Sequence, residues 1–223
     1  EAIVAPFLRS RKILTVDYLI LSHPRIDHYG GMTTIVREFT PREFWSAAGQ
    51  GGTARFDELE RTLSHAPTER LVFHAARPCR QLDEVRACFL YPPRGADRPS
   101  LVLRLEFGEA SLLFAGDIEK RDEDELLRDP GGLQSRVLKV PRHGSAAASS
   151  PAFVAAVRPR LAIVSVGARN AQGLPSAEVV ERYRSIGAEV LRTDQDGAVI
   201  VETDGRKLRY RTYRSGKQGT ITF

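Results

Sequence analysis

The sequence predicts a mixed α/β fold in which helices cover β-sheets. Short apolar segments of strand length alternate along the chain with segments of helical periodicity, and hairpins occur between them. Hydrophobic residues make up 42% of the 223 residues, which allows a sizeable core, and no repeat or linker-like stretch divides the chain. We therefore expect one continuous domain over residues 1–213 and a polar, loosely held tail over 214–223.

The individual elements follow from periodicity and from turn residues. The expected strands cover residues 17–21, 44–46, 71–73, 87–90, 100–107, 111–115, 137–140, 161–166, 190–191, 198–202 and 208–213. The expected helices cover residues 32–39, 56–63, 119–128, a segment from 151 onward, and 176–186. Ser150 is the expected N-cap before Pro151, and a flexible loop is expected over 48–52.

The net charge, the length of the apolar runs and the first residues of the chain bear on the partners and the kind of parent protein that we expect. The net charge of +5 and the pI of about 9.5 fit a polyanion such as nucleic acid or a membrane surface, and an ordinary solvated basic surface fits equally well. No apolar run approaches the roughly 20 residues of a membrane span, and no Gly-rich loop has the spacing of a nucleotide-binding motif. The chain opens without Met and, we expect, within a strand, so we expect a fragment of a longer protein.

Cys79 and Cys88 allow at most one disulfide and lie too far apart for a C-x-x-C motif. We favour two ordinary, half-buried thiols. A disulfide between them would instead fit an exported domain.

Three polar clusters each come directly after an apolar strand. They are the six residues from His23 to His28, the pair Gly116-Asp117, and the segment that begins at His143. The ends of strands are where α/β folds place their sites. Imidazole and carboxylate groups suit zinc, manganese or iron. A single Gly-Asp or His-Gly pair is ordinarily only a turn, but the three clusters together predict a present or ancestral metal site.

These motifs resemble those of a known family. Residues 22–31 resemble the H-x-H/D-x-D-H motif of metallo-β-lactamase-fold hydrolases. Residues 138–145 resemble the second histidine motif of one branch, the hydrolase domain of ComEC-type DNA-internalisation competence proteins. The similarity covers nearly the whole chain and is specific to this branch from about Leu101 onward. It implies a metallo-β-lactamase-like αββα sandwich whose N-terminal strands are missing from this fragment.

The resemblance also implies the roles of particular residues. His23, Asp27 and His28 would ligate metal, Asp117 would bridge two ions, and His143 would complete the site. The cofactor would be one or two divalent ions, zinc or manganese, with Asp27, Asp117 and His143 carrying catalysis. The substrate would be single- or double-stranded DNA. The parent protein would lie in the inner (cell) membrane, with this domain facing the periplasm or the exterior and working with the membrane-channel part of the same chain.

The sequence departs from the family pattern at three positions. Arg25 stands where the family has Asp or His, Arg142 stands where it has the first of two histidines, and Leu174 stands where it has a histidine between Gly and Pro. Arginine stays protonated and cannot ligate a metal. A guanidinium near Asp117 could instead replace a lost cation electrostatically.

Three functions remain open on these residues. The first, which we favour, is a metal-dependent nuclease or phosphodiesterase, with Ser145 assisting phosphate binding. The second is a degenerate DNA-binding or structural domain without metal, in which Arg25 and Arg142 contact phosphates. The third is a hydrolase of the same fold that acts on a thioester, lactam or lactone.

Overall fold

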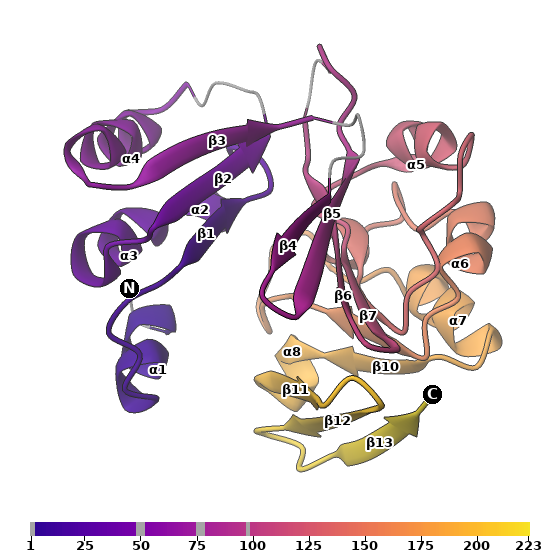
Figure 1. The fold of residues 1–223 in the computed structure, drawn as a ribbon. Helices are drawn as coiled ribbons and strands as arrows, with labels where there is room; N and C mark the ends of the chain where they lie inside the picture. The colour runs from indigo at the N-terminus through magenta and orange to yellow at the C-terminus, as the bar shows by residue number, and fades with distance from the viewer. Residues whose placement is uncertain (1–2, 48–51, 75–78, 97–98) are drawn as a thin grey trace. The chain divides into compact units, whose positions relative to one another are not determined.

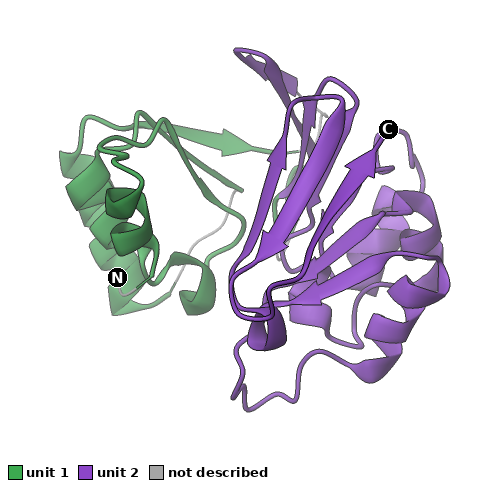
Figure 2. Cartoon of the chain, turned by 90° about the horizontal axis from the view of Figure 1, so that it is seen from below, with its two compact units in different colours: residues 1–75, 92–101 green, residues 76–91, 102–223 purple. Residues whose placement is uncertain are grey.

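A computed structural model describes residues 3–47, 52–74, 79–96 and 99–223 (Figure 1). The chain divides into two compact units, coloured separately in Figure 2: unit 1 is residues 1–75 and 92–101, and unit 2 is residues 76–91 and 102–223. The loop predicted at 48–52 lies outside the described residues except for Gly52. No helix among the described residues is both long enough and apolar enough to cross a membrane.

Unit 1 contains a parallel sheet with the spatial order β1-β2-β3. Its strands are Tyr18–Leu21 (β1), Glu43–Ala47 (β2) and Glu69–Phe73 (β3). Its helices are Val4–Ser10 (α1), Ile26–Tyr29 (α2), Met32–Phe39 (α3) and Ala54–His65 (α4). α3 and α4 lie on the same side of this sheet in Figure 1, and their apolar faces pack against strand residues such as Leu21 and Phe44.

α1 corrects the expectation that the chain opens within a strand. Residues 4–10 form a helix, and Ala5 of this helix packs against Ile35 and Phe39 of α3. Burial of one side of the segment therefore follows a helical spacing.

Unit 2 contains a seven-stranded mixed sheet with the order β10-β9-β8-β7-β6-β5-β4. Its strands are Cys79–Leu82 (β4), Val85–Tyr91 (β5), Val102–Phe107 (β6), Ala110–Phe114 (β7), Val137–Lys139 (β8), Leu161–Val164 (β9) and Glu189–Arg192 (β10). β7 to β10 run parallel to one another, and β4 to β7 pair antiparallel. The carboxyl ends of the four parallel strands therefore share one edge of the sheet.

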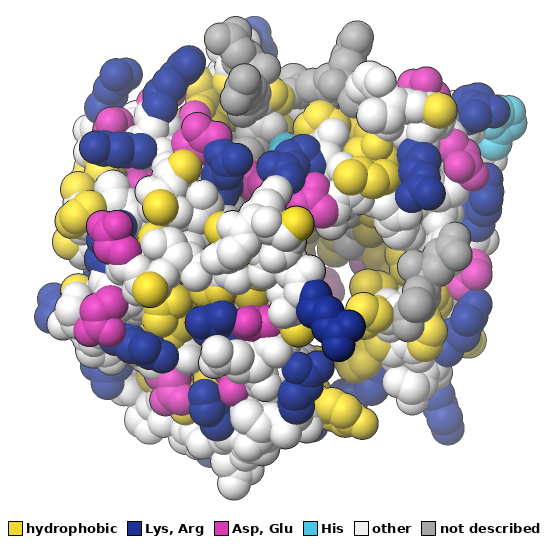
Figure 3. Space-filling view, turned by 180° about the vertical axis from the view of Figure 1, so that it is seen from behind, with side chains coloured by type: hydrophobic (Ala, Val, Ile, Leu, Met, Phe, Trp, Pro, Cys, Tyr) yellow, Lys and Arg dark blue, Asp and Glu magenta, His cyan; other side chains and the backbone are white. Residues whose placement is uncertain are grey.

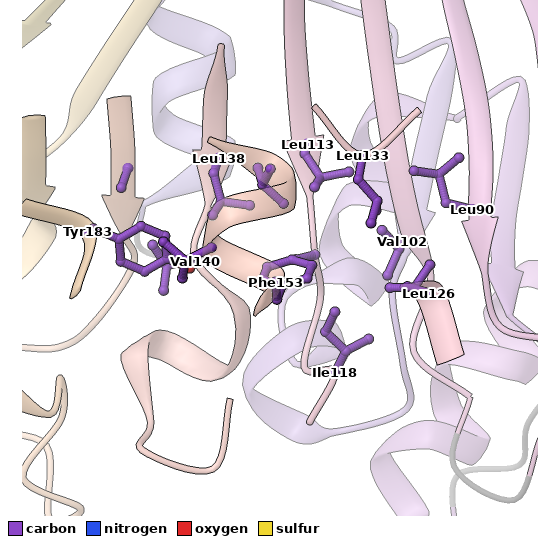
Figure 4. Packing of buried hydrophobic residues seen from close by; sticks show 14 of the residues in the cluster. Leu90, Val102, Leu113, Ile118, Leu126, Leu133, Leu138, Val140, Phe153 and Tyr183 are labelled. Atoms are coloured by element: carbon purple, nitrogen blue, oxygen red, sulfur yellow. The ribbon is translucent and has the colours of Figure 1, made fainter. Parts of the chain in front are cut away.

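Helices cover one face of this sheet and enclose the main core. They are Lys120–Leu126 (α5), Pro151–Val157 (α6) and Ala177–Ser185 (α7), while a short 3₁₀ turn, Pro141–Gly144 (η1), and Thr193–Asp196 (α8) follow β8 and β10. Figure 4 shows side chains of strands β6 to β8 and of helices α5 to α7 interleaved in this core. Ser150 caps α6 as predicted, since its Oγ accepts a hydrogen bond from Phe153 N at 3.3 Å.

Unit 2 also contains a third, antiparallel sheet, which corrects the expectation of a loose tail at 214–223. Its strands are Val199–Thr203 (β11), Lys207–Thr212 (β12) and Gln218–Thr222 (β13). β13 pairs along β12, and Ile221 packs in a cluster with Leu208 and Leu161. Gly219 lies against the Tyr210 ring, where a Cβ would overlap the phenol, so a larger residue there would displace this ring.

Cys79 and Cys88 form a disulfide, which corrects the preference for two free thiols. The two residues are direct partners in the antiparallel pair β4–β5, with Cα atoms 4.0 Å apart. The sequence did not predict β4, so it gave no reason to place Cys79 opposite Cys88.

Candidate metal centre

The first group of predicted ligands lies in the turn after β1 in unit 1. The buried strand ends at Leu21, and His23 is 8% exposed. The single turn of α2 then places Asp27 and His28 side by side, with His28 Nε2 3.8 Å from Asp27 Oδ2. That separation is too long for a hydrogen bond. Two ligand atoms at about 2.1 Å from one ion lie about 3 to 4 Å apart, so the pair fits the donor set of a metal ion.

Ser22 holds both histidines of this turn. Its Oγ lies 3.1 Å from Nδ1 of His23 and 3.1 Å from Nδ1 of His28, and the two ring centroids are 4.0 Å apart. A hydroxyl oxygen can accept two hydrogen bonds, so both Nδ1–H groups can donate to it. In that arrangement each Nε2 keeps the lone pair that a metal needs. Ser22 lies within the motif at 22–31, but the sequence alone does not indicate this role.

Arg25 contacts one of the predicted ligands directly. Its Nε lies 3.2 Å from Asp27 Oδ1, and its Nη2 lies 3.4 Å from Asp27 Oδ2. Both side chains are about two-fifths exposed, so water screens the pair and its free energy is small. The guanidinium nevertheless engages both carboxylate oxygens, and a cation bound to Asp27 would have to compete with it.

The second group of predicted ligands lies at the carboxyl edge of the sheet in unit 2. Asp117 follows β7, and His143 follows β8. His143 Nδ1 lies 2.7 Å from the backbone carbonyl of Ser165, which follows β9. A carbonyl can only accept, so a neutral His143 carries its proton on Nδ1 and its lone pair on Nε2. That Nε2 lies 3.7 Å from Asp117 Oδ1, which again fits two ligands of one ion.

The backbone at His143 is strained. Arg142 and His143 both have left-handed conformations, with φ of 45° and 54°, and Gly144 has φ of 81°. Left-handed non-glycine residues cost about 1–3 kcal/mol each, and such strain concentrates at functional sites. Hydrogen bonds hold the turn: Arg142 N donates to Gly116 O at 3.2 Å, and Ser176 N donates to Gly144 O at 2.9 Å.

The structure also places the three remaining site residues. The Arg142 guanidinium forms an ion pair with Glu119, a partner that sequence reasoning did not identify. Ser145 Oγ accepts a hydrogen bond from Ala147 N at 3.3 Å. Leu174 packs against the main core, where a histidine would add a polar ring.

The chain is similar in sequence to parts of longer bacterial proteins. No protein-family model matches it. It is 33% identical over 201 residues to Competence protein ComA of Neisseria gonorrhoeae, covering 88% of this chain and 26% of that protein. It is 28% identical over 228 residues to ComE operon protein 3 of Bacillus subtilis (strain 168), covering 100% of this chain and 29% of that protein. The chain thus spans less than a third of the length of these relatives.

Two solved structures that superpose on this chain show its fold. The metallo-β-lactamase fold protein YhfI from Bacillus subtilis superposes with a TM-score of 0.57 at 10% identity, covering 99% of this chain and 84% of that one. CmlA, a diiron β-hydroxylase from Streptomyces venezuelae, superposes with a TM-score of 0.55 at 13% identity, covering 94% of this chain and 45% of that one. The chain is similar in sequence to one part of these competence proteins, and it has the metallo-β-lactamase fold.

The predicted fold class is thereby confirmed. The structure places the predicted ligands of the domain in two groups, each just after a strand. His23, Asp27 and His28 follow β1 in unit 1, and Asp117 and His143 follow β7 and β8 in unit 2. Two groups position these ligands, Ser22 Oγ and the Ser165 carbonyl. The structure shows their contacts, which the sequence did not indicate.

Proposed function

We propose that the chain is a metal-dependent hydrolase domain that cleaves phosphodiester bonds of DNA during competence. The names of the homologous proteins support the link to competence. The observation that carries the hydrolase proposal is the Asp117–His143 pair, in which a fixed tautomer leaves the His143 Nε2 lone pair beside a carboxylate.

In this proposal the ligands of both motifs serve one metal centre. His23, Asp27 and His28 come from the first motif, and Asp117 and His143 come from the second. The order of the motifs along the chain and their resemblance to the family pattern support this. Imidazole and carboxylate donors suit one or two ions of zinc or manganese.

The residues around the ligands have separate tasks. A bound divalent ion would supply an activated water and would polarise a phosphoryl oxygen. Ser22 orients the two imidazoles of the first motif, and the Ser165 carbonyl orients His143. Ser145, one residue beyond the strained turn, offers a hydroxyl group near which a phosphate can bind.

A second function has an observation in its favour. The Arg25 guanidinium contacts both carboxylate oxygens of Asp27. It therefore places a positive charge beside a predicted ligand that would otherwise attract a metal cation. In this alternative the domain holds no metal, and Arg25 and Arg142 bind DNA phosphates without cleavage.

Cleavage assays separate the two functions. The domain is incubated with labelled single- and double-stranded DNA and either Zn²⁺ or Mn²⁺, and Asp117→Ala serves as the inactive control. The hydrolase proposal expects metal-dependent cleavage that Asp117→Ala abolishes and that Arg25→Asp, which restores a ligand, increases. DNA binding without cleavage in any divalent ion, weakened by Arg25→Ala, would establish the alternative.

We also propose that the domain faces the periplasm or the exterior and that its parent chain lies in the cell membrane. The Cys79–Cys88 disulfide supports an oxidising compartment. Protease added to spheroplasts of cells that carry a tagged parent should digest the domain. Digestion only after lysis would contradict this orientation.

A further inference from the structure

The basic excess of the chain is confined to its C-terminal segment. The 19 residues from Gly205 to Phe223 hold six of the 33 Lys and Arg residues and none of the 28 Asp and Glu residues. The rest of the chain is nearly neutral, with 27 cationic and 28 anionic side chains. Figure 3 shows acidic and basic side chains interspersed over the face in view. The segment coincides with the hairpin of β12 and β13.

Strand alternation sorts the side chains of β12 onto two faces. Leu208 and Tyr210 are buried and pack in the cluster beneath the sheet. Lys207, Arg209 and Arg211 therefore lie on the outer face, at intervals of about 6.7 Å. Tyr213 continues the alternation one step beyond the strand and is 86% exposed, the highest fraction among the exposed large hydrophobic residues of the described chain.

The surroundings leave this row positively charged. The outward residues of β13 opposite the row are Thr222, Thr220 and Gln218, which are polar and uncharged. Asp204 lies 3.8 Å from Lys207, and Glu202 of β11 is the register partner of Arg209. Among the described residues Arg209 and Arg211 nevertheless take part in no ion pair within 4.0 Å.

We propose that the row Lys207, Arg209, Arg211 and Tyr213, here called the β12 stripe, binds single-stranded nucleic acid. Guanidinium groups recognise phosphate with paired hydrogen bonds, and an exposed phenol ring offers a surface on which a base can stack. Stacking requires an unpaired base, which favours a single strand over a duplex. The stripe lies wholly within unit 2 and involves no metal ligand, so it goes beyond the proposed hydrolase.

The charge part of the proposal is tested by anisotropy of a labelled oligothymidylate of about 16 nucleotides, titrated with the domain in EDTA at several salt concentrations. The variant is Arg209→Gln/Arg211→Gln. The matched control is Arg121→Gln/Arg128→Gln, which removes the same charge from exposed positions in and just after α5. We expect the stripe variant to raise Kd at least about tenfold and to reduce the salt slope by about 1.4, as two lost phosphate contacts require. The control should change Kd less than about twofold.

The stacking part is tested with Tyr213→Ala and Tyr213→Phe. The alanine variant should weaken binding by about 5- to 150-fold, and the phenylalanine variant should bind like the wild type. Equal loss in the stripe and control variants, unchanged binding in both, or binding to anionic vesicles but not to the oligonucleotide would overturn the proposal.

Different results would contradict the hydrolase proposal and the proposal for the β12 stripe. Asp117→Ala should keep full oligonucleotide affinity in EDTA, and Arg209→Gln/Arg211→Gln should keep its metal content. Loss of affinity in Asp117→Ala would show that the strand binds at the candidate metal centre and not at the stripe.

Discussion

His143 and its neighbour Arg142 adopt a left-handed backbone that side chains of L-residues disfavour, and Gly144 extends the same run. The conformation turns the chain sharply after β8 and brings His143 Nδ1 to the Ser165 carbonyl. Gly144 has little room, because a Cβ there would lie 2.5 Å from Pro175 Cβ. The turn thus combines two requirements for glycine, a positive φ and a close approach.

A pair of glycine substitutions separates these requirements. Gly144 and Gly187 both have φ of 81°, but nothing lies within 4 Å of a Cβ at Gly187. We expect Gly187→Ala to lower the free energy of unfolding by about 1–2 kcal/mol and Gly144→Ala to lower it by at least about 1 kcal/mol more. Urea denaturation of both variants measures the difference. Equal losses in the free energy of unfolding would show that Pro175 shifts away from the new Cβ at no cost in stability.

Ser22 is predicted to set the metal affinity through the two imidazoles that it contacts. Ser22→Ala should weaken binding of Zn²⁺ or Mn²⁺ about 10- to 100-fold, because the rings lose the group that orients them. Ser22→Thr keeps the hydroxyl and should bind metal like the wild type. Titration with a competing chelator gives the affinities. An unchanged metal affinity in Ser22→Ala would show that Ser22 does not orient the two imidazoles for metal binding.

The sequence indicated the five candidate ligands because each follows an apolar strand in a motif of recognisable composition. It could not indicate the groups that orient them. Ser165 acts through a backbone carbonyl, which carries no sequence signal, and Glu119 meets Arg142 from a segment 23 residues away.

At the scale of elements, periodicity predicted those segments that bury one regular face. α3 was predicted with its observed bounds, and the hairpin of β6 and β7 was predicted with its turn. α1, β4 and β13 were not predicted, because each is short and buries few side chains. β13 depends on Gly219 fitting beneath Tyr210, a contact between strands that a local pattern cannot show.

The disulfide between β4 and β5 is predicted to stabilise unit 2. Cys79 and Cys88 are nine residues apart, and closing a loop of that length in the unfolded chain contributes about 2.5 kcal/mol. Reduction should lower the free energy of unfolding by about this amount in a urea titration. The double variant Cys79→Ser/Cys88→Ser should show the same loss and no response to reductant. Equal stability of oxidised and reduced protein would contradict the prediction.

Asp196 is predicted to make the C-terminal sheet sensitive to acid. Burial opposes its ionisation, but hydrogen bonds from Arg192 N and Ser215 Oγ and the contact with Lys217 Nζ outweigh burial and lower its pKa. A lowered pKa contributes stability that is present above the ordinary carboxyl pKa of about 3.9 and is lost as the pH falls through the folded-state value.

Urea denaturation between about pH 6 and pH 3 tests this contribution. Asp196→Asn should be less stable than the wild type near neutral pH, and the difference should shrink as the pH falls below about 4. A difference that stays constant over this range would show that the charge of Asp196 does not contribute.

At the scale of the whole molecule, the fold class followed from the alternation of strands and helices, and the solved structures confirmed it. The overall charge of +5 suggested a polyanionic partner but not its place. Side-chain alternation along β12 places Lys207, Arg209 and Arg211 in one row on one face, and we propose this row as the place. The strand at 208–213 was predicted from the sequence, but β13, whose outward residues opposite the row are uncharged, was not.

The central claim, that both motifs bind metal, is tested most directly by metal analysis. Mass spectrometry would measure the metal content of the domain purified without added metal and again after dialysis against zinc and manganese. Asp117→Ala and His28→Ala, one from each unit, are the comparison variants. We predict one or two ions per wild-type chain and loss of metal in both variants. Absence of metal from the wild type even after dialysis would contradict the account and leave the metal-free, DNA-binding alternative.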